Sequence, residues 1–188
     1  MSDEGEIPEP KAKRPLILNY KKAFDSFLGE LGTLEGFYAS VSAANVSTKN
    51  VLNQRLREHM ENEKVRKAIK EVSKIPQQHI DLLREMFIIY LVVIFEDFLK
   101  KIVEIRCNEL NMDESKKRNC LKIFSYKDFK YKWEKIADLF GIMGQFKNNT
   151  LKELFERRNI LVHNKGVVDK KYIKNVKNSE YKEGNKIL

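Results

Sequence analysis

The chain has 188 residues, 42% of them hydrophobic, and this length and composition favour one globular domain that needs no disulfides to hold its core. Its formal charge of +9 at pH 7 indicates an anionic partner such as nucleic acid, or only a lysine-rich surface. The two cysteines, Cys107 and Cys120, lack the paired spacing of a zinc site or a disulfide framework, which is typical of a reducing compartment. The longest apolar run, residues 86–95, is too short to cross a bilayer as a helix.

The N-terminal part of the chain is predicted to be a leader followed by extra helices. Residues 1–15 carry three prolines and almost nothing to bury, so we expect a disordered leader. They include no basic region leading into an apolar one, which favours a cytoplasmic protein. Residues 16–75 have apolar positions at helical steps, with a break expected near Gly32, a polar connection at 45–49 and a helix end at Pro76.

A long central helix is predicted over residues 77–110, with two apolar stripes that must both be covered. The second stripe contains Met86, Ile89 and Val93. Glu96 and Asp97 continue this second stripe, so carboxylates lie where apolar side chains are expected, and they are candidates to support a charged site. Alternatively, they form surface ion pairs with Lys100 and Lys101, four residues further on.

The segment 121–143 follows a polar connection at 111–119 and interleaves basic and aromatic residues. This pattern suits RNA, because bases stack on rings while lysines contact phosphates. Helical spacing instead places most of the rings in a core stripe. The residues expected on the solvent side, and as RNA contacts, are Lys127, Lys130, Tyr131 and Lys132.

The helix predicted over residues 151–165 carries the polar groups that are the main candidates for catalysis. Arg158 falls on the apolar stripe of this helix, where a guanidinium needs a carboxylate, a phosphate or a partner surface. Asn159 and His163 are four residues apart and share a neighbouring face. Gly166 is the expected left-handed cap, which places His163 in the last turn.

Residues 158–163, RNILVH, followed by NKGVVD, resemble the Arg-x4–6-His signature of HEPN-domain ribonucleases. The apolar run at 88–99, with its two acids, is similar to the acid-bearing core helix of that superfamily. The resemblance covers about residues 76–173 and implies an all-α, HEPN-like helical bundle over 76–176, to which the preceding residues add N-terminal helices. Arg157 also has the allowed spacing, but Arg158 rather than a small polar residue follows it.

The resemblance also implies an activity, that of a metal-independent endoribonuclease. In such an enzyme the ribose 2′-hydroxyl attacks the phosphate, His163 acts as acid or base, Arg158 stabilises the phosphate, and Asn159 hydrogen-bonds the ring or the substrate. Arg157 and Lys165 join the expected RNA contacts. No cofactor motif or metal-ligand cluster is present in the sequence.

The superfamily further implies a homodimer with a shared cleft and a cyclic-phosphate product. Its prokaryotic members commonly serve as toxins or in antiphage defence, so an antitoxin or defence-system partner is expected. Two alternatives stay open: a non-catalytic module that binds RNA or a nucleotide, and a dimerisation scaffold in which Arg158 pairs with Glu96 or Asp97.

After the motif, a short helix is predicted over residues 169–176. The lysine-rich end, residues 170–188, offers little to pack, so residues 177–188 are expected to form a basic tail. The superfamily usually carries one more helix after its motif, which suggests that the tail ends before a last helix.

Overall fold

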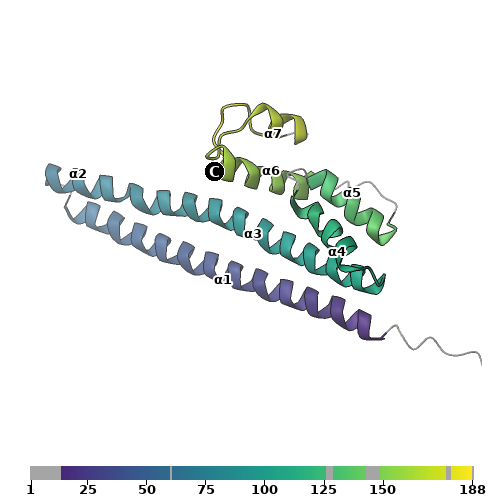
Figure 1. Ribbon diagram of the computed structural model, residues 1–188. Helices are drawn as coiled ribbons and strands as arrows, with labels where there is room; N and C mark the ends of the chain where they lie inside the picture. The colour runs from purple at the N-terminus through teal and green to yellow at the C-terminus, as the bar shows by residue number, and fades with distance from the viewer. Residues whose placement is uncertain (1–13, 60, 126–128, 143–148, 177–178, 188) are drawn as a thin grey trace, which may run out of the picture. The chain divides into compact units, whose positions relative to one another are not determined.

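The computed structural model describes residues 14–59, 61–125, 129–142, 149–176 and 179–187, and over these residues the protein is all-α, as predicted (Figure 1). The helices are α1 (Arg14–Glu58), α2 (Glu63–Val72), α3 (Lys74–Glu109), α4 (Glu114–Leu121), a 3-10 helix (Lys122–Ser125), α5 (Phe129–Phe140), α6 (Asn149–His163) and α7 (Lys170–Asn175). None of the helices in these ranges is long and apolar enough to span a membrane.

The chain divides into two compact units whose boundaries cut through α1 and α3. The first unit contains residues 1–28 and 96–145, and the second contains residues 29–95 and 146–188. The domain limits predicted from the sequence, at residues 15, 75 and 176, stay predictions.

Helix α1 is continuous, so the break predicted near Gly32 and the polar connection predicted at 45–49 were wrong. Thr33, beside the glycines that suggested the break, and Thr48, in the predicted polar connection, donate hydrogen bonds to carbonyls one turn back. The Thr33 hydroxyl reaches the Gly29 carbonyl at 3.0 Å, and the Thr48 hydroxyl reaches the Ala44 carbonyl at 3.0 Å. These side chains satisfy their hydroxyl groups within the helix, so they do not interrupt it.

The single helix predicted over residues 50–74, ending before Pro76, is divided among the end of α1, α2 and the start of α3. Helix α2 begins after Asn62, whose side chain accepts a hydrogen bond from the Val65 N–H at 3.2 Å, and it ends at Ser73. Pro76 lies in the first turn of α3, where its missing N–H costs no intrahelical bond. The predicted central helix, 77–110, is confirmed as α3.

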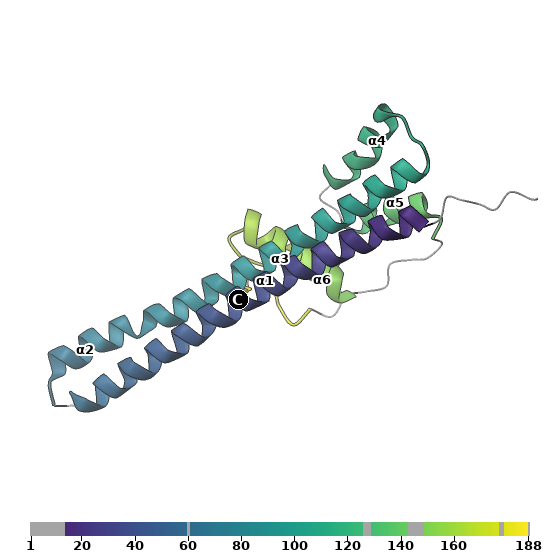
Figure 2. The same ribbon diagram turned by 90° about the horizontal axis from the view of Figure 1, so that it is seen from below.

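In the second unit, residues 29–58 of α1 and 74–95 of α3 lie side by side (Figure 2), with the ring centroids of Tyr38 and Phe87 5.0 Å apart. Helix α6 packs against α3 through an edge-on contact between Phe95 and Phe155, with 6.1 Å between their ring centroids. The second stripe of α3 stays partly open, since Met86 is 38% and Val93 46% exposed. The prediction that both stripes are covered was therefore wrong.

The C-terminal segment of the second unit folds back onto the turn after α6. The Val168 N–H donates to the Asn185 carbonyl at 2.8 Å, and the Ile187 N–H donates to the Gly166 carbonyl at 2.8 Å. A buried cluster results, with Tyr181 packed against it: Ile160, Val168, Tyr172, Val176 and Ile187. The prediction that this lysine-rich end has little to pack was wrong, because its few apolar residues converge.

The first unit is built from the start of α1, the end of α3, and α4 to α5. The rings of Phe27 and Phe98 stack with centroids 4.6 Å apart, and Arg106 Nε donates to the Leu139 carbonyl at 3.3 Å. Helix α4 occupies most of the predicted polar connection at 111–119. Asp113 starts α4 by accepting a hydrogen bond from the Lys116 N–H at 2.8 Å.

Candidate functional site

The predicted catalytic residues lie in the C-terminal half of α6. Arg158 is half-buried, and its Nη1 donates a hydrogen bond to Asn159 Oδ1 at 3.0 Å. His163 is the last residue of α6, and its side chain is exposed. One arm of the guanidinium is thus oriented by a neighbouring amide, while the imidazole is open to solvent at the helix end.

The turn that follows α6 places His163 and Lys165 at the surface. Lys165 and Gly166 both have left-handed backbones, with φ of 53° and 78°, and the Gly166 N–H donates to the Ile160 carbonyl at 3.1 Å. The left-handed cap predicted at Gly166 is confirmed. Asn164 Nδ2 donates to Asp169 Oδ2 at 2.6 Å, which ties this turn to the start of α7.

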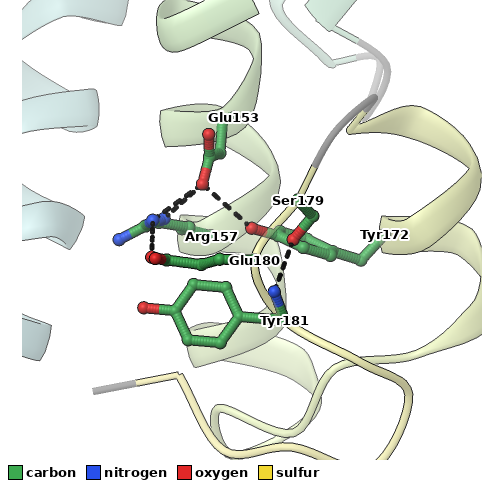
Figure 3. A network of polar contacts seen from close by, with 6 residues as sticks. All are labelled: Glu153, Arg157, Tyr172, Ser179, Glu180 and Tyr181. Carbon is green, nitrogen blue, oxygen red and sulfur yellow. Dashed lines mark hydrogen bonds and ion pairs between the residues drawn. The ribbon is translucent and has the colours of Figure 1, made fainter.

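Arg157, predicted as an RNA contact, has partners within its own unit (Figure 3). Its guanidinium donates to Glu153 Oε1, at 2.7 Å from Nη2 and 3.0 Å from Nε, and Nη2 lies 3.6 Å from Glu180 Oε1. The guanidinium carbon lies 5.1 Å from the ring centroid of Tyr181. Burial by itself lowers the pKa of Arg157, but the hydrogen bond and charge of Glu153 raise that pKa above its usual value. The positive charge of Arg157 is therefore largely engaged in holding the C-terminal segment.

Tyr172 extends this network into the core of the second unit. Its hydroxyl donates to Glu153 Oε1 at 3.2 Å, and its ring is fully buried. Burial is the main reason that the pKa of Tyr172 is raised, which keeps the phenol protonated as a donor. The four-residue spacing of Glu153 and Arg157 could have been found in the sequence, but their contacts with the tail could not.

Glu96 and Asp97, the acids predicted to support the site, each pair with a lysine of the first unit. Glu96 accepts a hydrogen bond from the ammonium of Lys132, and only 5% of Lys132 is exposed. Asp97 Oδ2 lies 3.7 Å from Lys101 Nζ, the surface pair that the four-residue spacing allowed.

The prediction that Lys132 faces solvent was wrong, and its predicted contact with RNA is untested. Lys132 shares a face of α5 with Phe129 and Ile136, both buried. Its aliphatic chain is buried with theirs, and its ammonium reaches a carboxylate, since a buried charge requires a partner.

The other predicted RNA contacts of this unit lie on the surface of α5. Lys130 is exposed, with its Nζ 3.6 Å from Glu134 Oε1. Tyr131 is exposed, and Lys135 Nζ lies 5.7 Å from its ring centroid. Lys127 lies outside the described residues.

Arg158, Asn159 and His163 thus all lie in the C-terminal half of α6 in the second unit, with Arg158 and Asn159 in contact. Within the described ranges, no three His, Cys, Asp or Glu side chains are grouped as they are around a metal ion. A groove of about 540 Å³ lies beside Arg157, lined mainly by apolar residues of α3 and α6. No family model, curated protein or solved structure matches the chain.

Proposed function

We propose that the protein is a metal-independent endoribonuclease of HEPN type, with Arg158, Asn159 and His163 as its catalytic residues. The observation that carries the proposal is an exposed imidazole at the end of α6, five residues after a half-buried arginine that is oriented by an amide. A histidine packed against carbon would not exchange protons with a substrate. The exposure of His163 therefore favours a reactive role over a purely structural one.

The chemistry that suits these groups is strand cleavage by the substrate's own 2′-hydroxyl. The 2′-oxygen attacks the adjacent phosphorus, the bond to the 5′-oxygen breaks, and a 2′,3′-cyclic phosphate is left. An imidazole works well here because its ordinary pKa lies close to neutral pH. A guanidinium presents a planar set of donors to the phosphate oxygens as charge develops on them.

Two proton-transfer groups are needed, because one removes the proton of the 2′-hydroxyl while the other protonates the leaving oxygen. Each chain supplies one histidine at this helix end, so we propose a homodimer in which two copies of α6 meet at a two-fold axis. Val162, next to His163, is 51% exposed and offers an apolar contact at that axis. Sedimentation equilibrium tests this step: a monomer at micromolar concentration that still cleaves RNA at nanomolar concentration excludes the shared site.

Lys165 is exposed and follows His163 by two residues, and we propose it as an RNA contact, together with Lys127, Lys130 and Tyr131. The biological setting that we propose is a cytoplasmic toxin or antiphage role, with an antitoxin or defence-system partner. Its support is the motif resemblance.

The test is RNA cleavage by His163→Ala and Arg158→Ala, each compared with a variant of the same residue type elsewhere. His59→Ala and Arg55→Ala are the matched controls, since both side chains are exposed and lie far along the chain from α6. We expect each α6 variant to lose about 10²–10⁴-fold in cleavage rate and to keep its helical circular dichroism. EDTA should leave wild-type cleavage intact, and a 2′-deoxy residue at the scissile position should prevent it.

Either of two outcomes would overturn the proposal and favour another function. Salt-sensitive RNA binding without cleavage over a broad RNA panel would make the protein a non-catalytic RNA-binding module. Unfolding of Arg158→Ala, with His163→Ala unaffected in folding and activity, would make Arg158 structural and favour the dimerisation scaffold.

A further inference from the structure

The first unit brings three sulfur atoms together where α3 passes into α4. Cys107 is in the last turns of α3, Met112 is in the connection, and Cys120 is near the end of α4. The Cys120 thiol donates to Met112 Sδ with 3.8 Å between the sulfurs, and the Cys107 thiol is a close neighbour of the Cys120 thiol. Both cysteines of the chain therefore meet at one point, together with a thioether.

The spacing of these sulfurs suits a three-coordinate metal ion. A metal–thiolate bond is about 2.3 Å long, so three sulfurs in a trigonal plane around one ion lie about 4.0 Å apart. The 3.8 Å separation of Cys120 Sγ and Met112 Sδ is close to this value. The backbone supports the arrangement, because the Met112 N–H donates to the Cys107 carbonyl at 3.0 Å.

The ligand set selects for a soft cation. Two thiolates and a thioether favour Cu(I), whereas Zn(II) in structural sites takes four ligands of the His, Cys and carboxylate types. No grouping of three such residues occurs among the residues that the structure describes, so the thioether is needed to complete the set.

The site has both an entrance and a protected interior. Cys107 is fully buried, whereas Cys120 is half-buried and lines a groove of about 540 Å³ together with residues of α5. The depth of Cys107 shields this sulfur from oxidants in solution.

We propose that Cys107, Met112 and Cys120 form a binding site for one Cu(I) ion. On binding, the two thiols release their protons to solvent, two Cu–thiolate bonds and one Cu–thioether bond form, and no electron is transferred. The ion links the end of α3 to α4. This inference is independent of the proposed catalytic residues, Arg158, Asn159 and His163, which lie in the other unit.

The experiment is an anaerobic titration of the reduced protein with Cu(I) in competition with the chelator bicinchoninate. We expect one Cu(I) per chain to be withheld from the chelator and X-ray absorption to show three sulfurs at about 2.3 Å. Cys120→Ser should weaken binding more than about 100-fold, since even the loss of an outer-shell partner costs about 10–100-fold. Met112→Leu keeps the apolar volume and should weaken binding at least about tenfold.

The matched control is Met86→Leu, which removes an exposed thioether in the second unit and should leave Cu(I) affinity unchanged. Circular dichroism is used to check that each variant is folded. Cys107 is not substituted, because a change at this fully buried position could unfold the protein. The proposal is overturned if wild type surrenders all Cu(I) to the chelator, or if Cys120→Ser binds as tightly as wild type. Unchanged affinity in Met112→Leu would likewise overturn the three-sulfur set.

Discussion

The guanidinium carbon of Arg157 lies 5.1 Å from the ring centroid of Tyr181, which joins α6 to the segment that ends the described chain. With the pair to Glu153, this contact gives a residue from the motif region an intramolecular role. The RNA contact predicted for Arg157 is untested. Loss of this side chain affects packing as well as charge, so Arg157→Ala is a poor control for RNA binding.

Arg157→Ala should lower the free energy of unfolding by about 1–3 kcal/mol, because it leaves part-buried carboxylate and ring surfaces without their partner. Urea denaturation measures this loss, and limited trypsin digestion should cut the C-terminal segment sooner. Arg55→Ala is the control, because its pair with Glu58 is exposed and should cost less than about 0.5 kcal/mol. Equal stability of the two variants would contradict a locking role for Arg157.

Lys132→Met should destabilise the protein by about 3–5 kcal/mol, because it leaves Glu96 part-buried without its ammonium partner. Adding Glu96→Leu should restore much of this loss, since two apolar side chains replace an ion pair of low exposure. Chemical denaturation of the single and double variants gives the coupling between the two positions. Lys130→Met is the exposed control on the same helix, and a comparable loss there would argue against burial as the cause.

Ile160→Ala should cost about 2–5 kcal/mol, because Ile160 is 3% exposed and belongs to the cluster that anchors the C-terminal segment. Val162→Ala tests the exposed side of the same helix and should change stability by less than about 0.5 kcal/mol in the monomer. Thermal or urea unfolding measures the loss of stability in the Ile160→Ala and Val162→Ala variants. If Val162→Ala weakens only the dimer, the two-fold contact proposed at the end of α6 gains support.

Gly166→Ala and Gly32→Ala should have opposite effects on stability. Gly166 has a φ of 78°, so a side chain there is strained and should cost about 1 kcal/mol or more. Gly32 is helical, with no atom within 4 Å of an added Cβ, so alanine should stabilise α1 by about 0.5–1 kcal/mol. Differential scanning calorimetry measures both, and a loss at Gly32 would indicate that α1 needs flexibility there.

The sequence by itself determined the features that depend on residues close to one another along the chain. Helical periodicity predicted an all-α protein, the extent of α3 and the position of α6, because the repeat of apolar side chains is a local property. Gly166 marked the end of α6 for a similar reason, since only glycine adopts a left-handed backbone at little cost. The order of Arg158, Asn159 and His163 was likewise readable, and their catalytic role stays a prediction.

The tertiary structure alone decided which side chains meet across long separations in the chain. Lys132 pairs with Glu96 over 36 residues, and Tyr172 reaches Glu153 over 19, and no periodicity encodes either pair. Cys107 and Cys120 looked solitary because spacing rules describe ligands within one motif, whereas these two are joined by the turn between α3 and α4. A charge or a thiol takes its role from the groups around it after folding, and those groups are set by packing rather than by sequence distance.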